Sequence, residues 1–200
     1  MHFSLPIPMF PILSDLRKIL EYKRSQGATG FDPHSESGWD WGWRVHPITG
    51  VRSWHNGVDL GAPAGTPIYA PWDGVVHVWN DDLNGNGMRI THSGVPGVLK
   101  TGYAHLQAYD SSICEGCEVK RGQCVGYVGS TGRSTGAHLH LTIWADGSVI
   151  VDGESHADAN PMPYLEDAVE AASGKKKLMG MGLMGGLLLA SYFVYLALKK

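Results

Sequence analysis

Hydrophobic and polar residues alternate along residues 138–144, and this alternation is the clearest structural signal in the chain. Side chains of an extended strand point to opposite faces in turn, so Leu139, Leu141 and Ile143 would share one face. The opposite face would carry His138, His140, Thr142 and Trp144. The pattern predicts a β-strand that buries one face in a core and presents two histidines on the other.

Shorter β-like runs recur from Val45 to Ile150, and Asp-Gly, Asn-Gly and glycine-rich turn sequences separate them. No stretch between these two residues has a convincing helical period. We therefore predict an all-β fold with antiparallel sheets, arranged as a sandwich or an open barrel. The predicted strands are Pro67–Ala70, Gly74–Trp79, Met88–His92, Leu99–Ala104, Gln123–Val128, Ala137–Trp144 and Ser148–Val151.

The chain before this region, residues 1–41, is predicted to form a short helix followed by a covering loop. Ser14 is a favourable helix N-cap, and Leu16, Ile19 and Leu20 give the helix an apolar stripe. The first basic residues follow the apolar start of the chain instead of preceding it, which is the reverse of a cleavable secretory signal. We therefore expect no removed signal peptide.

Residues 178–198 carry no charge and are flanked by lysines on both sides. As a helix with a rise of about 1.5 Å per residue, this run would span about 30 Å, the thickness of a bilayer core. Because the run is too long for a typical buried helix, we predict a transmembrane helix, joined to the β domain by a stem at residues 166–177. Gly182, Gly186 and Ala190 form a small-xxx-small row through which two such helices could associate.

Composition and charge add one inference to the predicted architecture, because they limit the kind of macromolecule that the protein can bind. A hydrophobic fraction of 43% is sufficient for a packed core, and the formal net charge is −3. Five of the 16 basic residues and none of the 19 acidic residues follow Gly174, so the body is more acidic than the whole chain. An acidic body opposes binding to a polyanion, and we expect no nucleic-acid partner.

A second cluster with metal-binding chemistry lies far upstream of the two histidines. The run His55-Asn56-Gly57-Val58-Asp59 places an imidazole and a carboxylate four residues apart. Its Asn-Gly pair favours a turn over a helix. A lone His-x-His sequence is more often polar surface than a metal site, so the upstream cluster is what makes a metal site the better interpretation.

Five segments of the chain occur in the order and spacing of one known family. They are Gly42–Gly50, His55–Pro67, Tyr103–Leu106, Lys120–Gly126 and Gly129–His140. Together they resemble the lysostaphin-type zinc endopeptidases, which cut the peptide cross-links of bacterial cell wall. The resemblance extends over residues 42–165, which we predict to be one zinc endopeptidase domain with the lysostaphin-type peptidase fold.

The resemblance implies a role for each of five residues. His55, Asp59 and His140 match the family's zinc ligands, which implies one Zn²⁺ per chain. Two imidazoles and one carboxylate leave a tetrahedral zinc one open position, as in catalytic sites. His105 and His138 match two histidines that lie near the metal without binding it. They would move the proton and stabilise the oxyanion of the tetrahedral intermediate, and the sequence leaves open which does which.

Other features receive simpler interpretations. The glycine-rich stretch before the His-x-His sequence lacks a following lysine and helix, so we exclude a phosphate-binding loop and expect a tight loop beside the metal, with Ser134 or Thr135 near the substrate. We expect Trp54 and Trp144 to line a substrate cleft. The remaining histidines, His34, His46, His77, His92 and His156, are interpreted as surface or turn residues. The cysteines, Cys114, Cys117 and Cys124, form either one disulfide or three buried thiols.

These inferences predict a zinc-dependent endopeptidase that hydrolyses peptide cross-links of bacterial peptidoglycan and is anchored to a membrane by a single C-terminal helix. An anchored wall hydrolase without an export signal fits the membrane of a bacteriophage virion, with the bacterial envelope as the alternative setting. The competing interpretation is a non-hydrolytic peptidoglycan-binding or spike-like module of the same fold. The bond that is cut, glycine–glycine or a D-alanyl cross-link, is not readable from the sequence.

Overall fold

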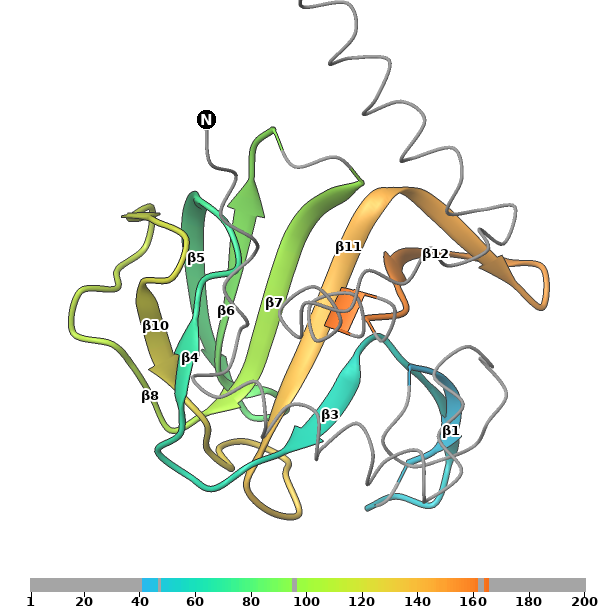
Figure 1. The fold of residues 1–200 in the computed structure, drawn as a ribbon. Helices are drawn as coiled ribbons and strands as arrows, with labels where there is room; N and C mark the ends of the chain where they lie inside the picture. Colours follow the sequence, from blue (N-terminus) through green and yellow to red (C-terminus); the bar gives the residue numbers. More distant parts are fainter. Residues whose placement is uncertain (1–40, 47, 95–96, 162–163, 166–200) are drawn as a thin grey trace, which may run out of the picture.

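The computed structural model describes residues 41–46, 48–94, 97–161 and 164–165, and this part of the chain consists of twelve β-strands (Figure 1). All strand pairings in it are antiparallel, which confirms the predicted all-β antiparallel fold. The strands are β1 (Gly42–Val45), β2 (Arg52–His55), β3 (Val58–Gly61), β4 (Pro67–Tyr69), β5 (Gly74–Asp81), β6 (Gly85–His92), β7 (Val98–Leu106), β8 (Ala108–Tyr109), β9 (Glu118–Val119), β10 (Cys124–Tyr127), β11 (His138–Val151) and β12 (Glu154–Ala159).

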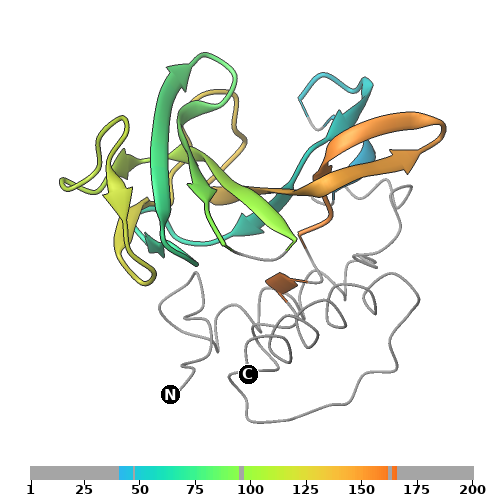
Figure 2. The ribbon, with the colours of Figure 1, turned by 90° about the horizontal axis from the view of Figure 1, so that it is seen from above.

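The strands form three sheets. The largest has the order β12-β11-β7-β6-β5-β9, and β3 also pairs with the first residues of β11. A smaller sheet has the order β4-β10-β8, and β1 pairs with β2. Figure 2 shows the β11–β12 and β1–β2 hairpins together at one side of the molecule, away from β4 and β10. The long strand β11 joins the β12 side to the rest of the large sheet through its pairing with β7.

The core lies between the large sheet and the small one. Leu139, Leu141 and Ile143 of β11 are at most 1% exposed, as their alternation predicted. Burying one such side chain stabilises the fold by about 1.5–3 kcal/mol. A Cβ on Gly126 of β10 would lie only 3.4 Å from Met88 Cε, so the small sheet packs directly on the large one. The opposite face of the large sheet is left for a site.

All seven predicted segments are extended, but the last two belong to one continuous strand. Ala137–Trp144 and Ser148–Val151 belong to the single strand β11, whose pairing with β12 shifts register between Trp144 and Val149. The sequence did not predict six further strands, β1, β2, β3, β8, β9 and β12. Five of these have four residues or fewer, too short for a period of two to be recognised, and β12 (Glu154–Ala159) is mostly polar.

Several predictions lie outside the described residues: the N-terminal helix, His34, the stem at 166–177, the helix at 178–198 and its Gly182, Gly186 and Ala190 row. The predicted domain boundaries likewise stay predictions. Within the part of the chain that the structure describes, no helix is long and apolar enough to cross a membrane.

The cysteines follow the first of their two alternatives. Cys114 and Cys117 form one disulfide, and Cys124 is half-buried outside it. The disulfide closes a short loop that carries Glu115, whose carboxylate contacts β5.

Candidate metal centre

The three predicted ligands come from three strands, β2, β3 and β11, and they lie near the start of β11. His55 ends β2, and Asp59 in β3 lies directly opposite His140 in the antiparallel pairing of β3 with β11. The chain between β2 and β3 is a bend and not a helix, as the Asn-Gly pair predicted. A Cβ on Gly57 would lie 2.8 Å from His140 Nε2 and closer still to the backbone oxygen of Leu141. Glycine is therefore required where the bend passes the ligand strand.

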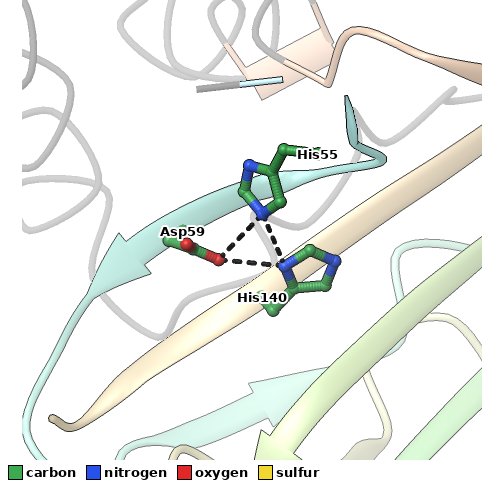
Figure 3. Close-up of side chains that lie close together, drawn as sticks. All are labelled: His55, Asp59 and His140. Atoms are coloured by element: carbon green, nitrogen blue, oxygen red, sulfur yellow. Dashed lines mark hydrogen bonds and ion pairs between the residues drawn. The ribbon is translucent and has the colours of Figure 1, made fainter. Parts of the chain in front are cut away.

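The side chains of His55, Asp59 and His140 converge on one point (Figure 3). Asp59 Oδ1 lies 2.9 Å from His140 Nδ1 and 3.3 Å from His55 Nε2. The two imidazole nitrogens are 3.0 Å apart. A tetrahedral zinc with bonds of about 2.0–2.1 Å holds neighbouring ligand atoms about 3.3 Å apart. The cluster therefore fits zinc in the number, type and spacing of its donor atoms.

The second ring nitrogen of His140 is held by polar groups. His140 Nε2 lies 3.2 Å from Asn56 Oδ1 and 3.1 Å from Thr142 Oγ1. An imidazole that donates its Nε2 proton to Asn56 keeps the lone pair of Nδ1 for a metal. From the sequence, Asn56 was predicted only to favour a turn, although it lies inside the motif that carries two predicted ligands.

Arg44 of β1 holds the second carboxylate oxygen of Asp59. Its Nη1 donates a hydrogen bond to Asp59 Oδ2 at 2.9 Å, and the two side chains are only 11% and 14% exposed. This charge-assisted contact leaves Oδ1 facing His55 and His140. Arg44 lies within the first of the five motifs, but its residue type alone predicts no function there. The signal that could have found it is a basic residue within a motif of an otherwise acidic body.

Burial and neighbouring charge set the protonation of the cluster. Burial lowers the pKa of His55 to about 4, against the opposing attraction of Asp59. Burial would raise the pKa of Asp59, but the charge of His55 and hydrogen bonds from His140 and His55 hold that pKa well below its usual value. At neutral pH the cluster therefore offers a carboxylate and a neutral His55, the protonation states that metal binding requires.

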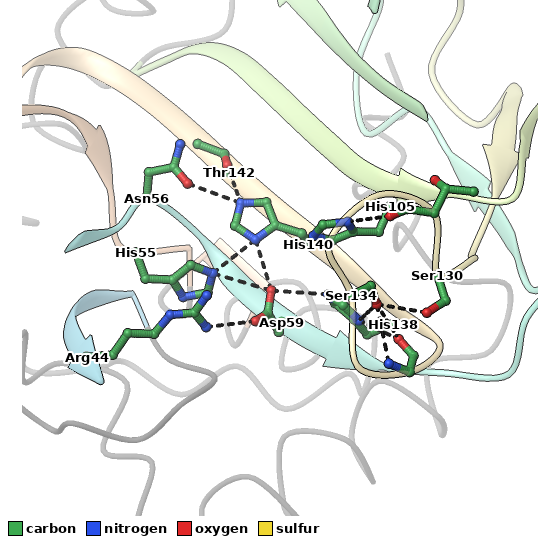
Figure 4. A network of polar contacts seen from close by, with 12 residues as sticks. Arg44, His55, Asn56, Asp59, His105, Ser130, Ser134, His138, His140 and Thr142 are labelled. Atoms are coloured by element: carbon green, nitrogen blue, oxygen red, sulfur yellow. Dashed lines mark hydrogen bonds and ion pairs between the residues drawn. The ribbon is translucent and has the colours of Figure 1, made fainter. Parts of the chain in front are cut away.

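His105 and His138 lie next to the cluster (Figure 4). Their ring centroids are 4.8 Å apart, and His138 Nε2 is 3.6 Å from Asp59 Oδ1. His105 Nδ1 donates to the Thr131 carbonyl and His138 Nδ1 to the Gly136 carbonyl, both at 2.8 Å. In the neutral form, each ring therefore keeps the lone pair of Nε2 as a proton acceptor.

The backbone of His105 is unusual for a residue with a side chain. Its φ is +60°, in the left-handed region that non-glycine residues rarely adopt. Such conformations persist where the surrounding structure fixes them, and they cluster at functional sites. Burial lowers the pKa of His105, partly opposed by its hydrogen bond to Thr131, so the ring is a neutral acceptor at neutral pH.

The glycine-rich loop before β11 lies beside the cluster, as expected. Ser134 Oγ contacts Ser130 Oγ at 2.8 Å and lies 3.4 Å from His138 Nδ1 (Figure 4). It also donates to the carbonyl oxygen of Gly136 at 2.9 Å. Ser134 thus helps to shape the segment that supplies the carbonyl partner of His138, while Thr135 is exposed.

A pocket of about 360 Å³ extends from His140 over the outer face of the large sheet. Trp144 lines it, as predicted, together with Trp79 of β5, for which the sequence suggested no role. Trp54 does not line this pocket. Its ring stacks on His156 at a centroid distance of 3.5 Å, and its Nε1 donates to Asp158 Oδ2 at 3.1 Å. These contacts belong to the packing around β12.

The interpretation of His92 as a surface or turn residue was wrong. His92 is 6% exposed, with Nδ1 3.0 Å from the Asp73 carbonyl and Nε2 2.9 Å from Thr101 Oγ1. It ends the inward-facing row of β6 that begins with Met88 and Ile90. In contrast, His46, His77 and His156 are at least partly exposed, in agreement with the prediction.

Comparison with known proteins finds related sequences and a related structure. The profile of Peptidase family M23 matches residues 53–152. The DD-carboxypeptidase/endopeptidase Mpg of Neisseria meningitidis is 38% identical over 147 residues, 73% of this chain and 32% of that protein. The peptidoglycan DD-endopeptidase ShyC of Vibrio cholerae is 39% identical over 133 residues, 66% of this chain and 27% of that protein. The chain thus spans less than a third of the length of these curated relatives.

Among solved structures, the catalytic domain of the antimicrobial peptidase lysostaphin from Staphylococcus simulans has the same fold. It superposes with a TM-score of 0.50 at 29% identity, over 64% of this chain and 89% of that domain. The likeness therefore covers nearly the whole of a catalytic domain.

Proposed function

The chain belongs to Peptidase family M23, and we propose that it is a zinc-dependent endopeptidase that hydrolyses the peptide cross-links of bacterial peptidoglycan. The resemblance inferred from five sequence motifs is thereby confirmed at the level of the family. The names of two curated relatives, a DD-carboxypeptidase/endopeptidase and a peptidoglycan DD-endopeptidase, favour the D-alanyl cross-link as the bond that is cut.

The observation that carries this proposal is the convergence of His55 Nε2, Asp59 Oδ1 and His140 Nδ1 at spacings of 2.9–3.3 Å. Three protein ligands leave one position of a tetrahedral zinc open, which distinguishes catalytic from structural sites. The pocket that begins at His140 provides room for a peptide beside this predicted ligand.

Residues of the chain supply the proton transfers. When bound, zinc supplies Lewis acidity, which polarises the scissile carbonyl and makes water a stronger nucleophile at neutral pH. Nε2 of either His105 or His138 accepts a proton from the attacking water, and the resulting imidazolium passes it to the leaving amine. The other ring, when protonated, donates from Nε2 to the developing oxyanion. The carbonyls of Thr131 and Gly136 hold both rings in the required orientation.

Digestion of purified walls tests this function. We expect the zinc-loaded full chain to reduce the turbidity of walls cross-linked through D-alanyl–diaminopimelate bonds, and mass spectrometry to identify a new D-alanine carboxyl terminus. A chelator should stop the reaction and added zinc should restore it. A new amino-terminal glycine from glycine-bridged walls would instead assign the glycine–glycine bond. Walls that bind the protein without losing any cross-link would favour the non-hydrolytic binding module.

We further propose that the enzyme is anchored in a membrane through residues 178–198, in a bacteriophage virion or in the bacterial envelope. This part of the proposal is supported by the uncharged run and its flanking lysines alone. The full chain should float with lipid vesicles, whereas a chain ending at Gly174 should not. Detection in purified virions would support the viral setting, and detection in envelopes of uninfected cells would contradict it.

A further inference from the structure

The far end of the pocket has no part in the chemistry proposed above. It is lined by His77 and Trp79 of β5 and by Arg89 of β6. Arg89 pairs with Gly102 in β7, which in turn pairs with Thr142, two residues after His140 on the same face of β11. With strands about 4.8 Å apart and about 3.3 Å per residue, the backbone of Arg89 lies roughly 12 Å from that of His140. This separation equals three to four residues of an extended peptide.

Two indole rings form the floor of the pocket between these ends. A Cβ on Gly102 would lie 2.6 Å from Trp144 Cζ3, and one on Gly87 would lie 2.5 Å from Trp79 Cζ2. Both rings therefore lie directly on the backbone of a neighbouring strand, where only glycine leaves room for them. An apolar floor reduces the screening of charges that meet above it.

The carboxylates beside the pocket already have partners. Glu115 Oε1 lies 2.7 Å from His77 Nδ1, and its Oε2 accepts a hydrogen bond from the backbone of Val78 at 2.8 Å. Asp81 Oδ1 accepts from the backbone and the side chain of Asn84. Neither carboxylate therefore needs Arg89 to satisfy its acceptors.

The pKa of the Glu115 carboxyl is lowered first by its hydrogen bonds to His77 and Val78 and last by the charge of Arg89. The Arg89 guanidinium itself makes no hydrogen bond or salt bridge with any other described residue, although Arg89 lines the pocket. A guanidinium presents a planar pair of donors that matches a carboxylate in two parallel hydrogen bonds. The stem peptides joined by D-alanyl cross-links carry free carboxylates on glutamate and diaminopimelate, whereas glycine bridges carry none.

We propose that Arg89 binds a free carboxylate of the peptidoglycan stem peptide, three to four residues from the scissile bond, and thereby determines which cross-links are cut. The inference rests on the proposed function, because it concerns substrate selection by the same site. Arg89 contributes to substrate binding rather than to bond cleavage, so its removal should raise KM far more than it lowers kcat.

The test compares two synthetic cross-linked peptides, one with free stem carboxylates and one with the same carboxyl groups converted to carboxamides. We expect the zinc-loaded full chain to cleave the free-acid peptide with a kcat/KM about tenfold higher, the usual contribution of a hydrogen bond between charged groups. Arg89→Gln should abolish this preference by raising KM for the free-acid peptide alone. Arg89→Lys, which keeps the charge without the planar pair of donors, should retain part of it.

Lys120→Gln is the charge-matched control, because Lys120 pairs with Asp73 outside the pocket. It should keep the full preference. Equal cleavage of both peptides by the unmodified chain, or an unchanged preference in Arg89→Gln at full zinc content, would overturn the inference and leave the endopeptidase function intact. Cleavage of neither peptide, together with intact walls in the digestion experiment, would overturn the function itself.

Discussion

The two ends of the pocket share one sheet face but are built differently. At the metal end, His55, Asp59 and His140 are within 3.3 Å of one another and hold each other in place before any substrate arrives. At the far end, Arg89 is exposed, and its guanidinium has no hydrogen-bond partner among the described residues before a ligand binds. The first end is preorganised for chemistry and the second is adapted for recognition. Substitutions at the two ends should therefore separate metal content and kcat from KM.

The largest effect is expected from removing a predicted ligand. In Asp59→Ala or His140→Ala, two donor atoms remain, too few to hold zinc at stoichiometric occupancy. We expect loss of bound zinc, measured by elemental analysis, together with loss of detectable wall cleavage. A circular dichroism spectrum should confirm that the β fold survives. Stoichiometric zinc in either variant would contradict the ligand assignment.

His138→Ala is the matched control, because His138 lies on the same face of β11 as His140 but its Nε2 is 3.6 Å from Asp59 Oδ1, outside the cluster of three converging side chains. This variant should keep its zinc and lose about 10²–10⁴-fold in kcat, the usual contribution of a general acid or base. If His138→Ala stripped the zinc while His140→Ala left it in place, the assignment of the two histidines would be reversed.

The difference between the ends also explains which parts of the site could be predicted from the sequence. The predicted ligands lie in short motifs, and the alternation over His138 to Trp144 fixes which side chains of β11 share a face. These features are local in the chain. Trp79 and Arg89 reach the pocket only because β5, β6 and β7 pair in a particular register, which no local pattern specifies.

Trp54 and His92 show the limits of local reasoning. Trp54 is adjacent to the predicted ligand His55, but adjacent residues of a strand point to opposite faces, and its indole packs near β12. His92 follows Met88 and Ile90 at a spacing of two, so its burial was readable from the same periodicity that identified β11. Placing Trp54 correctly required knowledge of β12, a strand that the sequence did not predict. His92 was misplaced because it was interpreted by residue type alone.

Substitution of Arg44 should have the smallest of these effects, a reduced affinity for zinc. It tests directly how Asp59 is held at the metal end. Arg44→Gln removes the charge-assisted hydrogen bond to Asp59 Oδ2, so Asp59 can rotate away from the two histidines. We expect zinc affinity to fall by about 10–100-fold, the usual consequence of losing a residue that orients a metal ligand. A competition titration against a chromophoric chelator measures this, and kcat at saturating zinc should change less.

Arg52→Gln in the same hairpin is the control, because the Arg52 guanidinium lies 4.6 Å from the centroid of the Trp43 ring and is not bonded to Asp59. It should leave zinc affinity unchanged, and Arg44→Lys should fall between the two. If Arg44→Gln also bound zinc with unchanged affinity, the pairing of β3 with β11, which sets Asp59 opposite His140, would be sufficient to orient the carboxylate. The metal end would then depend on strand register as fully as the far end does.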